Sequence, residues 1–145
     1  MNYDDACFAE TNEVGTGVVV RNKLGLVMVS LSEKIPMSLT VEILEAMAAR
    51  RAMIFTEELG LPRAIFEGDS ELVVKALLGD YSNWSCIGHM VKDCMVFSKL
   101  ARSLMSGNEV VHALTKRARK FFPLSTWMEP VPPNIFYLVY VDVIA

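Results

Sequence analysis

The sequence predicts an α/β fold, a mixed sheet of antiparallel and parallel strands flanked by helices. Two observations predict it. Residues 2–31 contain three β-rich segments with short connections, which is the pattern of an antiparallel three-strand meander. The residues that follow alternate between helix and strand signals, which is typical of helices packed on a sheet with parallel strands. With 145 residues, 52% of them hydrophobic and 21% charged, the chain has the size and balance of one globular domain.

The meander is expected at residues 2–8, 14–21 and 26–31. Valine, threonine and tyrosine favour these strands, and residues 22–25 (NKLG) carry a turn signal between the second and the third. Gly15 and Gly17 have no side chains beyond hydrogen, so another part of the chain can approach the backbone of the second strand closely there.

A long helix is expected at residues 41–60, where either Ser38 or Thr40 can serve as the cap and Gly60 with Pro62 ends it. Its apolar residues recur on one stripe: Val41, Leu44, Ala48, Ala52, Phe55 and Leu59. The expected elements beyond it are a short strand at 64–67, a helix at 71–78, further helical sequence across 83–104, and a last helix that opens at residues 107–108 and runs to 120.

The last 25 residues have a different composition, because residues 121–145 hold four of the six prolines and end in an apolar stretch. We therefore expect a main domain at residues 1–120 and an extended appendage at 121–145. The longest apolar run, 135–141, is far shorter than the ~20 residues of a membrane helix. Since no signal peptide is visible either, the sequence predicts an intracellular protein of the nucleus or the cytoplasm that does not enter membranes.

Charge and cysteine content exclude some classes of site. The net charge of −3 gives no overall basic signature, so nucleic-acid binding would depend on a local patch. Cys7, Cys86 and Cys94 are odd in number and lack metal-binding spacing, and we interpret them as buried hydrophobic residues in a reducing compartment.

Three acidic residues stand where chemistry is possible, and each has a plainer interpretation. Alternation in the first strand places Asp4 on the face of Asn2 and Ala6, where it could also simply face water. Glu45 lies near the apolar stripe of the long helix, at the edge of the core, where its charge needs a partner unless the side chain turns outward. Asp69 follows a short strand and could bind a ligand there or cap the next helix.

The order of these acids, with the segments around them, resembles the ribonuclease H superfamily of type 1, in particular its plant, retroelement-derived, reverse-transcriptase-like branch. Five segments carry the resemblance, and together they span roughly residues 2 to 120. They are 2–6 (NYDDA), 15–21 (GTGVVVR), 45–49 (EAMAA), 67–70 (EGDS) and 107–114 (GNEVVHAL).

The resemblance implies a ribonuclease H-like sheet and a nuclease that cuts the RNA strand of an RNA–DNA hybrid by two-metal hydrolysis. Asp4, Glu45 and Asp69 would then hold Mg²⁺, with Mn²⁺ as an alternative, because such ions prefer hard oxygen ligands. Asp4 and Asp69 would bridge or flank the ions, and Glu45 would hold one ion on the side of the RNA 2′-hydroxyl. The expected partner is the hybrid, and we expect a monomer.

The chain departs from this family in three places. The fourth acidic position falls on His112, which could ligate a metal or move a proton, although imidazole suits Mg²⁺ poorly and the residue could equally pack against the sheet. The stretch around residues 98–106 is short where the family has a full helix, a fifth strand and a loop, so we expect either a curtailed strand or a helix that has lost turns. Only three residues precede Asp4, which suggests a truncated product.

One dense basic cluster stands at the end of the last expected helix: Lys116, Arg117, Arg119 and Lys120. It could contact phosphates, but cations at a helix C-terminus also complement the helix dipole. Three hypotheses therefore remain: the metal-dependent nuclease, a catalytically inactive nucleic-acid-binding or interaction domain derived from a retroelement, and a globular domain whose acids are only caps and solvated surface.

Overall fold

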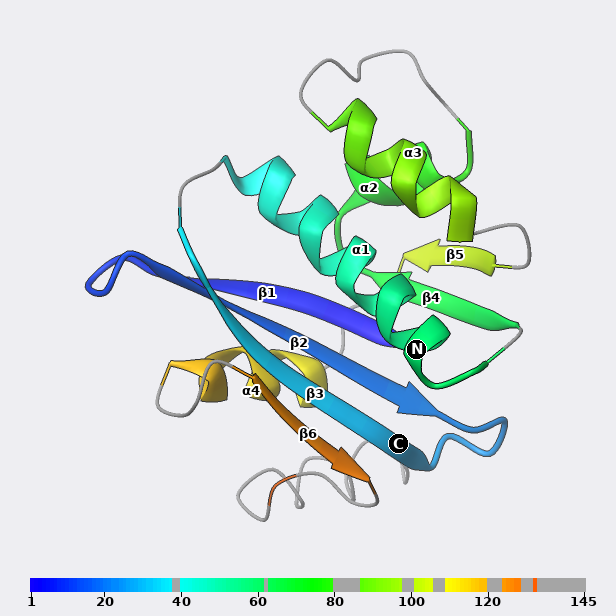
Figure 1. Cartoon of the computed structure of the whole chain (residues 1–145), viewed down its shortest axis with the longest axis horizontal. Helices are drawn as coiled ribbons and strands as arrows, with labels where there is room; N and C mark the ends of the chain where they lie inside the picture. The colour runs from blue at the N-terminus through cyan, green and yellow to red at the C-terminus, as the bar shows by residue number, and fades with distance from the viewer. Residues whose placement is uncertain are drawn as a thin grey trace.

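The computed structural model describes residues 1–37, 40–61, 63–79, 87–97, 101–105, 109–119, 124–128 and 132 (Figure 1). The strands are β1 (Asn2–Phe8), β2 (Glu13–Arg21), β3 (Val27–Pro36), β4 (Ala64–Gly68), β5 (Ala101–Met105) and β6 (Leu124–Met128). The helices are α1 (Val41–Glu58), α2 (Glu71–Leu77), α3 (Gly88–Phe97) and α4 (Glu109–Ala118). Within the described residues these strands form one sheet in the order β5-β4-β1-β2-β3-β6.

The expected meander is confirmed. Strands β1 and β2 pair antiparallel along the whole of β1, from Asn2↔Val19 to Phe8↔Glu13. Strands β2 and β3 pair from Glu13↔Pro36 to Arg21↔Val27, with an irregularity between Val20 and Arg21. The third strand therefore extends five residues beyond its expected end at residue 31, because polar residues at its far end still find backbone partners in β2.

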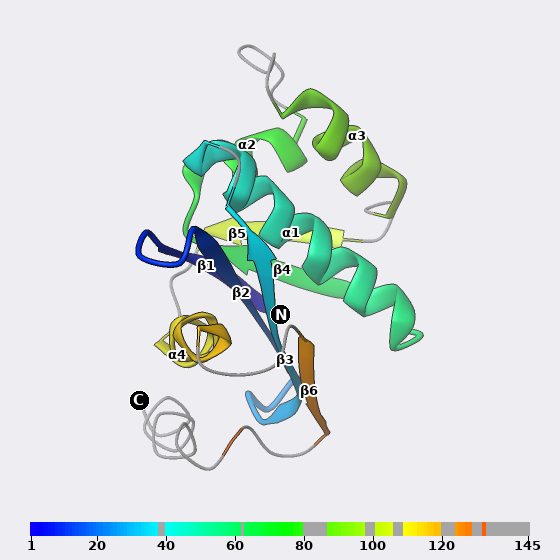
Figure 2. The same cartoon turned by 60° about the vertical axis from the view of Figure 1, so that its left-hand side comes forward.

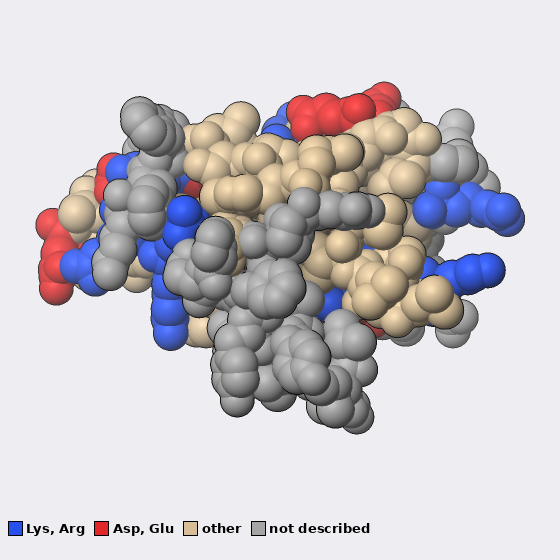
Figure 3. Space-filling view, turned by 90° about the horizontal axis from the view of Figure 1, so that it is seen from below, with Lys and Arg blue, Asp and Glu red and all other residues tan. Residues whose placement is uncertain are grey.

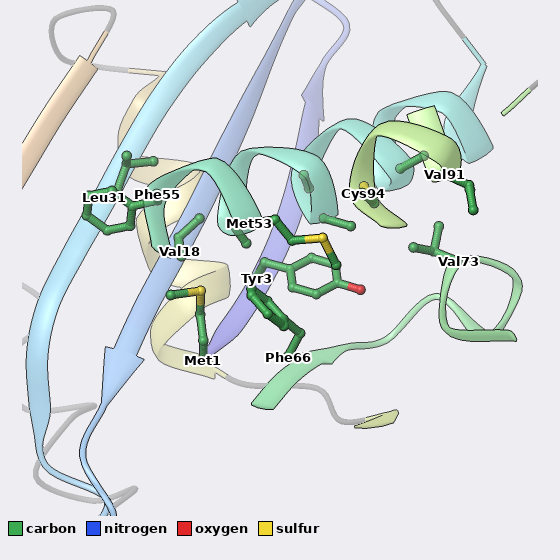
Figure 4. Close-up of a cluster of buried hydrophobic side chains, with 14 of the residues drawn as sticks. Met1, Tyr3, Val18, Leu31, Met53, Phe55, Phe66, Val73, Val91 and Cys94 are labelled. Carbon is green, nitrogen blue, oxygen red and sulfur yellow. The ribbon is translucent and has the colours of Figure 1, made fainter. Parts of the chain in front are cut away.

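Helices cover both faces of the sheet (Figure 2). Helices α1, α2 and α3 pack on one face over the main core, which includes Tyr3, Leu31 and Phe55 (Figure 4). Helix α4 lies alone among the described helices on the opposite face, where Val110, Val111 and Leu114 bury Val19. The expected apolar stripe of α1 is largely confirmed, but Val41 is 62% exposed because it begins the helix beyond the edge of this core.

Gly15 and Gly17 are where the α4 backbone meets β2. A Cβ atom on Gly17 would lie 2.6 Å from the carbonyl oxygen of Val111, and one on Gly15 would lie 2.1 Å from that of Thr115. The expected close approach at these glycines is thus confirmed, and it is a helix that approaches. This contact sets how near α4 lies to β1 and β2.

The helical expectation for residues 83–104 is only partly correct. Helix α3 occupies Gly88–Phe97, but Ala101–Met105 forms strand β5. Strand β5 pairs parallel with β4 from Ala64↔Ala101 to Gly68↔Met105, so it matches β4 over its full length and is not curtailed relative to it. Its residues include good helix formers, and pairing with a distant strand overrides that preference.

Part of the expected appendage belongs to the sheet. Strand β6 pairs antiparallel with β3, from Val29↔Met128 to Glu33↔Leu124, and forms an edge of the sheet. The division at residue 120 stays a prediction, since most of 121–145 lies outside the described residues.

The described part of the chain also tests the predictions about cysteine burial and about membrane-spanning helices. Cys94 is buried in the main core as expected, whereas Cys7 is exposed near the end of β1, and Cys86 lies outside the described residues. Among the residues that the structure describes, none of the helices is long and apolar enough to span a bilayer.

Candidate functional site

The candidate site lies where strands β1 and β4 part. Their parallel ladder has one residue pair, Asn2↔Glu67, and the Nδ2 group of Asn2 donates a hydrogen bond to Oε2 of Glu67 (2.8 Å). Strand β4 ends at Gly68, while β1 continues beside β2. Two residues beyond the pair on each segment come Asp4 and Asp69. The strand geometry therefore brings two of the predicted acids to the same opening in the sheet.

Gly68 allows the chain to turn close to β1 at this opening. A Cβ atom at this position would lie 2.4 Å from Cζ of Tyr3, whose ring is buried in the main core. The aromatic ring therefore packs directly against the backbone that precedes Asp69, and it fixes where that segment leaves the sheet.

Asp69 is not the cap of helix α2. The N-cap is Ser70, whose side chain accepts a hydrogen bond from the backbone N–H of Val73 (3.4 Å). Asp69 is exposed, and its charge raises the pKa of Asp4. The carboxylate of Asp69 is thus available to the opening, and the capping interpretation of this acid is wrong.

Asp4 is held from the opposite face of the sheet. The Nδ1 atom of His112, on α4, lies 2.8 Å from Oδ2 of Asp4, and the backbone N–H of Asp5 donates to Oδ1 of Asp4 (2.8 Å). Burial raises the pKa of Asp4; the hydrogen bond from His112 opposes that effect, and the charge of Asp69 adds to it. His112 is therefore a partner of Asp4, and it does not simply pack against the sheet.

Glu45 reaches the opening from α1. Burial raises the pKa of Glu45 to about 8, and the charges of Asp5, Asp69 and Asp4 contribute in that order. The charges of Asp4 and Asp69 therefore both act on Glu45, so the three predicted acids are near enough to interact electrostatically. A pKa this far above the ordinary value of a glutamate is typical of functional sites.

Asp5 is the member of the cluster that the sequence reasoning missed. Alternation places it on the face of Tyr3, away from Asp4, and Tyr3 packs in the main core with residues of α1. Burial raises the pKa of Asp5 to about 7, followed by the charges of Asp4 and Asp69. The signal available in the sequence was the Asp-Asp doublet, because successive residues of a strand point to opposite faces of the sheet and helices lie on both faces here.

The donor set of the cluster suits a hard divalent cation. Its groups are carboxylates, and the Oδ2 atom of Asp5 and the Oε2 atom of Glu45 are both buried without a hydrogen-bond partner. Buried acceptors of this kind are costly unless something satisfies them. In the described part of the chain, no three acidic, histidine or cysteine side chains are already arranged around one point. A cation would therefore have to draw these side chains together.

Two of the four residues of the predicted basic cluster, Arg117 and Arg119, are engaged within the molecule. The Arg117 guanidinium lies over the ring of Trp127 (5.2 Å to the centroid), and Arg119 pairs with Glu10 and lies over Phe8 (5.9 Å to the centroid). Lys116 is exposed, and Lys120 lies outside the described residues. Figure 3 shows Lys and Arg side chains gathered toward the two ends of the face in view, with uncharged side chains between them. A phosphate contact by this cluster stays a prediction.

The sheet order, the helices on both faces and the acids at the β1–β4 opening define the ribonuclease H-like class of α/β domains. Residues 2–118 match the family described as reverse transcriptase-like, so the chain belongs to that family. The superfamily assigned from the sequence is confirmed, whereas the plant branch stays a prediction. No curated protein matches the chain.

Solved structures agree on the fold. The ribonuclease H1 of the halophilic archaeon Halobacterium salinarum NRC-1 is 18% identical, with a TM-score of 0.71 over 81% of this chain and 94% of the other. The N-terminal ribonuclease H domain of a Mycobacterium tuberculosis protein is also 18% identical, with a TM-score of 0.67 over 80% of this chain and 88% of the other. LC11-RNase H1 in complex with an RNA/DNA hybrid is 18% identical, with a TM-score of 0.69 over 81% and 93%. At this identity the likeness establishes the fold.

Proposed function

We propose that the protein is a divalent-metal-dependent endoribonuclease that cuts the RNA strand of RNA–DNA hybrids. The observation that carries the proposal is the electrostatic cluster of Asp4, Glu45 and Asp69 at the β1–β4 opening. The hybrid bound by the structural neighbour LC11-RNase H1 supports the class of substrate.

Asp4 and Asp69 would hold Mg²⁺ or Mn²⁺ at the opening, with Glu45 as a third ligand on the side of the RNA 2′-hydroxyl. When bound, such ions lower the pKa of a coordinated water and offset the charge that develops on the phosphate. His112 keeps the Asp4 carboxylate oriented through its Nδ1 atom. Its hydrogen bond also opposes the rise in the pKa of Asp4, which favours the ionised form of that carboxyl.

The test is cleavage of a hybrid with a labelled RNA strand in Mg²⁺, with wild type compared to Asp69→Asn. We expect a loss of at least about 100-fold, because even outer-shell partners of a metal cost 10–100-fold when removed. Glu71→Gln is the matched control, since it also converts an acid to an amide, two residues further on, at an exposed position paired with Lys75. Equal activity of wild type and Asp69→Asn would refute the proposal.

A second candidate is an inactive nucleic-acid-binding domain with the same fold. His112 favours it, because this histidine stands where the family resemblance implies a fourth acid, and its imidazole is hydrogen-bonded to Asp4. In this case the protein would bind the hybrid and leave it uncut in both Mg²⁺ and Mn²⁺. A binding titration run beside the cleavage assay separates the two candidates.

A further inference from the structure

We propose that a groove at the end of the sheet from which β1 and β4 start binds an acidic, apolar peptide segment of a partner protein. The groove has a volume of about 990 Å³. It is separate from the candidate site, because neither Asp4, Glu45 nor Asp69 is among the described residues that line it. The proposal therefore does not depend on the cleavage of a hybrid.

The groove is lined by segments that are far apart in the sequence. Residues between 20 and 29 line it from the turn that joins β2 to β3, and residues between 59 and 65 line it from the end of α1 and the start of β4. Met128, the last residue of β6, completes it. Figure 1 shows the end of α1, the β2–β3 turn and the end of β6 on the same side of the molecule.

The surface of the groove is mainly apolar. Four exposed apolar side chains line it: Met28, Leu61, Ile65 and Met128. The β2–β3 turn beside it adds two more, Leu24 and Leu26. Together these are more than half of the large apolar side chains that are exposed in the described part of the chain. Apolar side chains that gather in this way on a surface mark a site that a partner covers.

The charged residues at the groove indicate the charge of the partner. Arg21, Lys23 and Arg63 line it, and both Lys23 and Arg63 are exposed. Glu67 is the one acid among the described lining residues, and its carboxylate accepts a hydrogen bond from Asn2 (2.8 Å). The groove is therefore positive in a chain whose net charge is −3. A segment that carries Asp or Glu beside apolar residues complements it.

The lining favours a peptide over a nucleic acid or a lipid surface. None of the described lining residues is aromatic, so unpaired bases would find no ring on which to stack. A bilayer would require apolar side chains that protrude, whereas these line a hollow. The thioether side chains of Met28 and Met128 are flexible and polarisable, which suits contact with the side chains of a peptide.

Hydrogen bonds hold two sides of the groove in place. In the β2–β3 turn, Oδ1 of Asn22 accepts hydrogen bonds from the backbone N–H groups of Leu24 (2.9 Å) and Leu26 (3.0 Å). After α1, the backbone N–H of Leu61 donates to the carbonyl oxygen of Thr56 (3.0 Å). Because segments that are already ordered lose little conformational entropy on binding, this arrangement reduces the cost of binding a peptide.

The experiment selects random peptides displayed on phage against the full chain, and then titrates the selected peptides into the protein. We expect them to combine Asp or Glu with large apolar residues. In NMR spectra they should shift the backbone amide signals of Met28, Leu61, Ile65 and Met128. Their affinity should fall as the salt concentration rises, because salt screens the exposed cations.

The double variant Lys23→Glu, Arg63→Glu should bind these peptides about tenfold more weakly or worse, because each change places a charge of the wrong sign at the groove. Both side chains are exposed, so the fold should keep its stability, and thermal unfolding checks this. Lys92→Glu is the matched control. It makes the same change of charge at an exposed position of α3 that does not line the groove, and it should leave the affinity unchanged.

Selected peptides without an acidic bias, or peptides that shift amide signals elsewhere, would overturn the proposal. A selection that enriches nothing, or equal affinities of the double variant and the wild type, would do the same. An oligonucleotide that shifts the amide signals of the groove would instead assign the groove to nucleic acid. A dimer that dissociates in Met128→Asp, as measured by analytical ultracentrifugation, would assign it to a second copy of the chain. Either result would refute a peptide partner.

Discussion

The Nδ1 atom of His112 lies 2.8 Å from Oδ2 of Asp4, which joins helix α4 to strand β1 across the face of the sheet opposite α1. The candidate site is therefore assembled from both faces, since Glu45 reaches the same opening from α1. Each side can be tested through the group that it contributes.

Replacing His112 should raise the pKa of Asp4 further. In the native protein the hydrogen bond from His112 opposes the effect of burial on this carboxyl. We expect His112→Ala to shift the titration of the Asp4 carboxyl carbon to higher pH, as followed by NMR in the absence of metal. The exposed His89 of α3 provides the control, and His89→Ala should leave this titration in place. A shift to lower pH would contradict the role of His112.

The metal-free protein should lose stability as the pH rises. Folding raises the pKa of Asp5 from 3.8 to about 7 and that of Glu45 from 4.5 to about 8, so the native state binds these protons more tightly than the unfolded state. Their contribution to stability is complete below the unfolded values and is lost as the pH rises through the folded ones. Urea unfolding between pH 4 and pH 8.5 measures the free energy of unfolding across this window.

Glu45→Gln should flatten this pH dependence, because the amide does not titrate. Saturating Mg²⁺ should also reduce it if the cation binds the cluster, since a bound ion favours the ionised carboxylates. A wild-type stability that increases from pH 5 to pH 8 would show that these two groups do not dominate the titration of the folded protein.

Gly17→Ala should destabilise the fold and disturb the site. The added Cβ would lie 2.6 Å from the Val111 carbonyl oxygen, so α4 would have to move away from β2. We expect a loss of about 1–3 kcal/mol, which is typical of overpacking, together with a weaker contact between His112 and Asp4. Gly88→Ala is the control, because nothing lies within 4 Å of a Cβ there and its effect should be neutral or slightly stabilising. Equal effects of the two substitutions would argue against a backbone contact at Gly17.

Two neighbouring residues at the start of α2 should have separate roles, Ser70 in helix capping and Asp69 in the candidate site. Ser70→Ala should lower stability by about 0.5–1 kcal/mol, because Ser70 supplies the N-cap oxygen. Asp69→Asn should leave stability within about 0.5 kcal/mol of wild type, as is usual for an exposed residue, while it abolishes cleavage. Chemical denaturation of both variants provides the measurement. A large loss of stability in Asp69→Asn would show that Asp69 stabilises the fold, which would contradict this separation.

Local patterns in the sequence were sufficient for the meander and for α1, β4 and α2, whereas the three candidate acids were singled out through the family resemblance and stay a prediction. Alternation and helical spacing are properties of neighbouring residues, so each of these segments carries its own signal. Gly15 and Gly17 similarly predicted that another segment packs closely against the backbone of β2, and α4 is that segment.

Only the tertiary structure decided the features that depend on distant partners. Ala101–Met105 is a strand because β4 offers a parallel partner, and Leu124–Met128 joins the sheet because the edge of β3 is open to it. The hydrogen bond between His112 and Asp4, and the effect of the Asp5 charge on Glu45, likewise depend on two helices packed on opposite faces of one sheet. A single sequence records which residues are polar or apolar, but the charges that act on a carboxyl are set by segments far away along the chain.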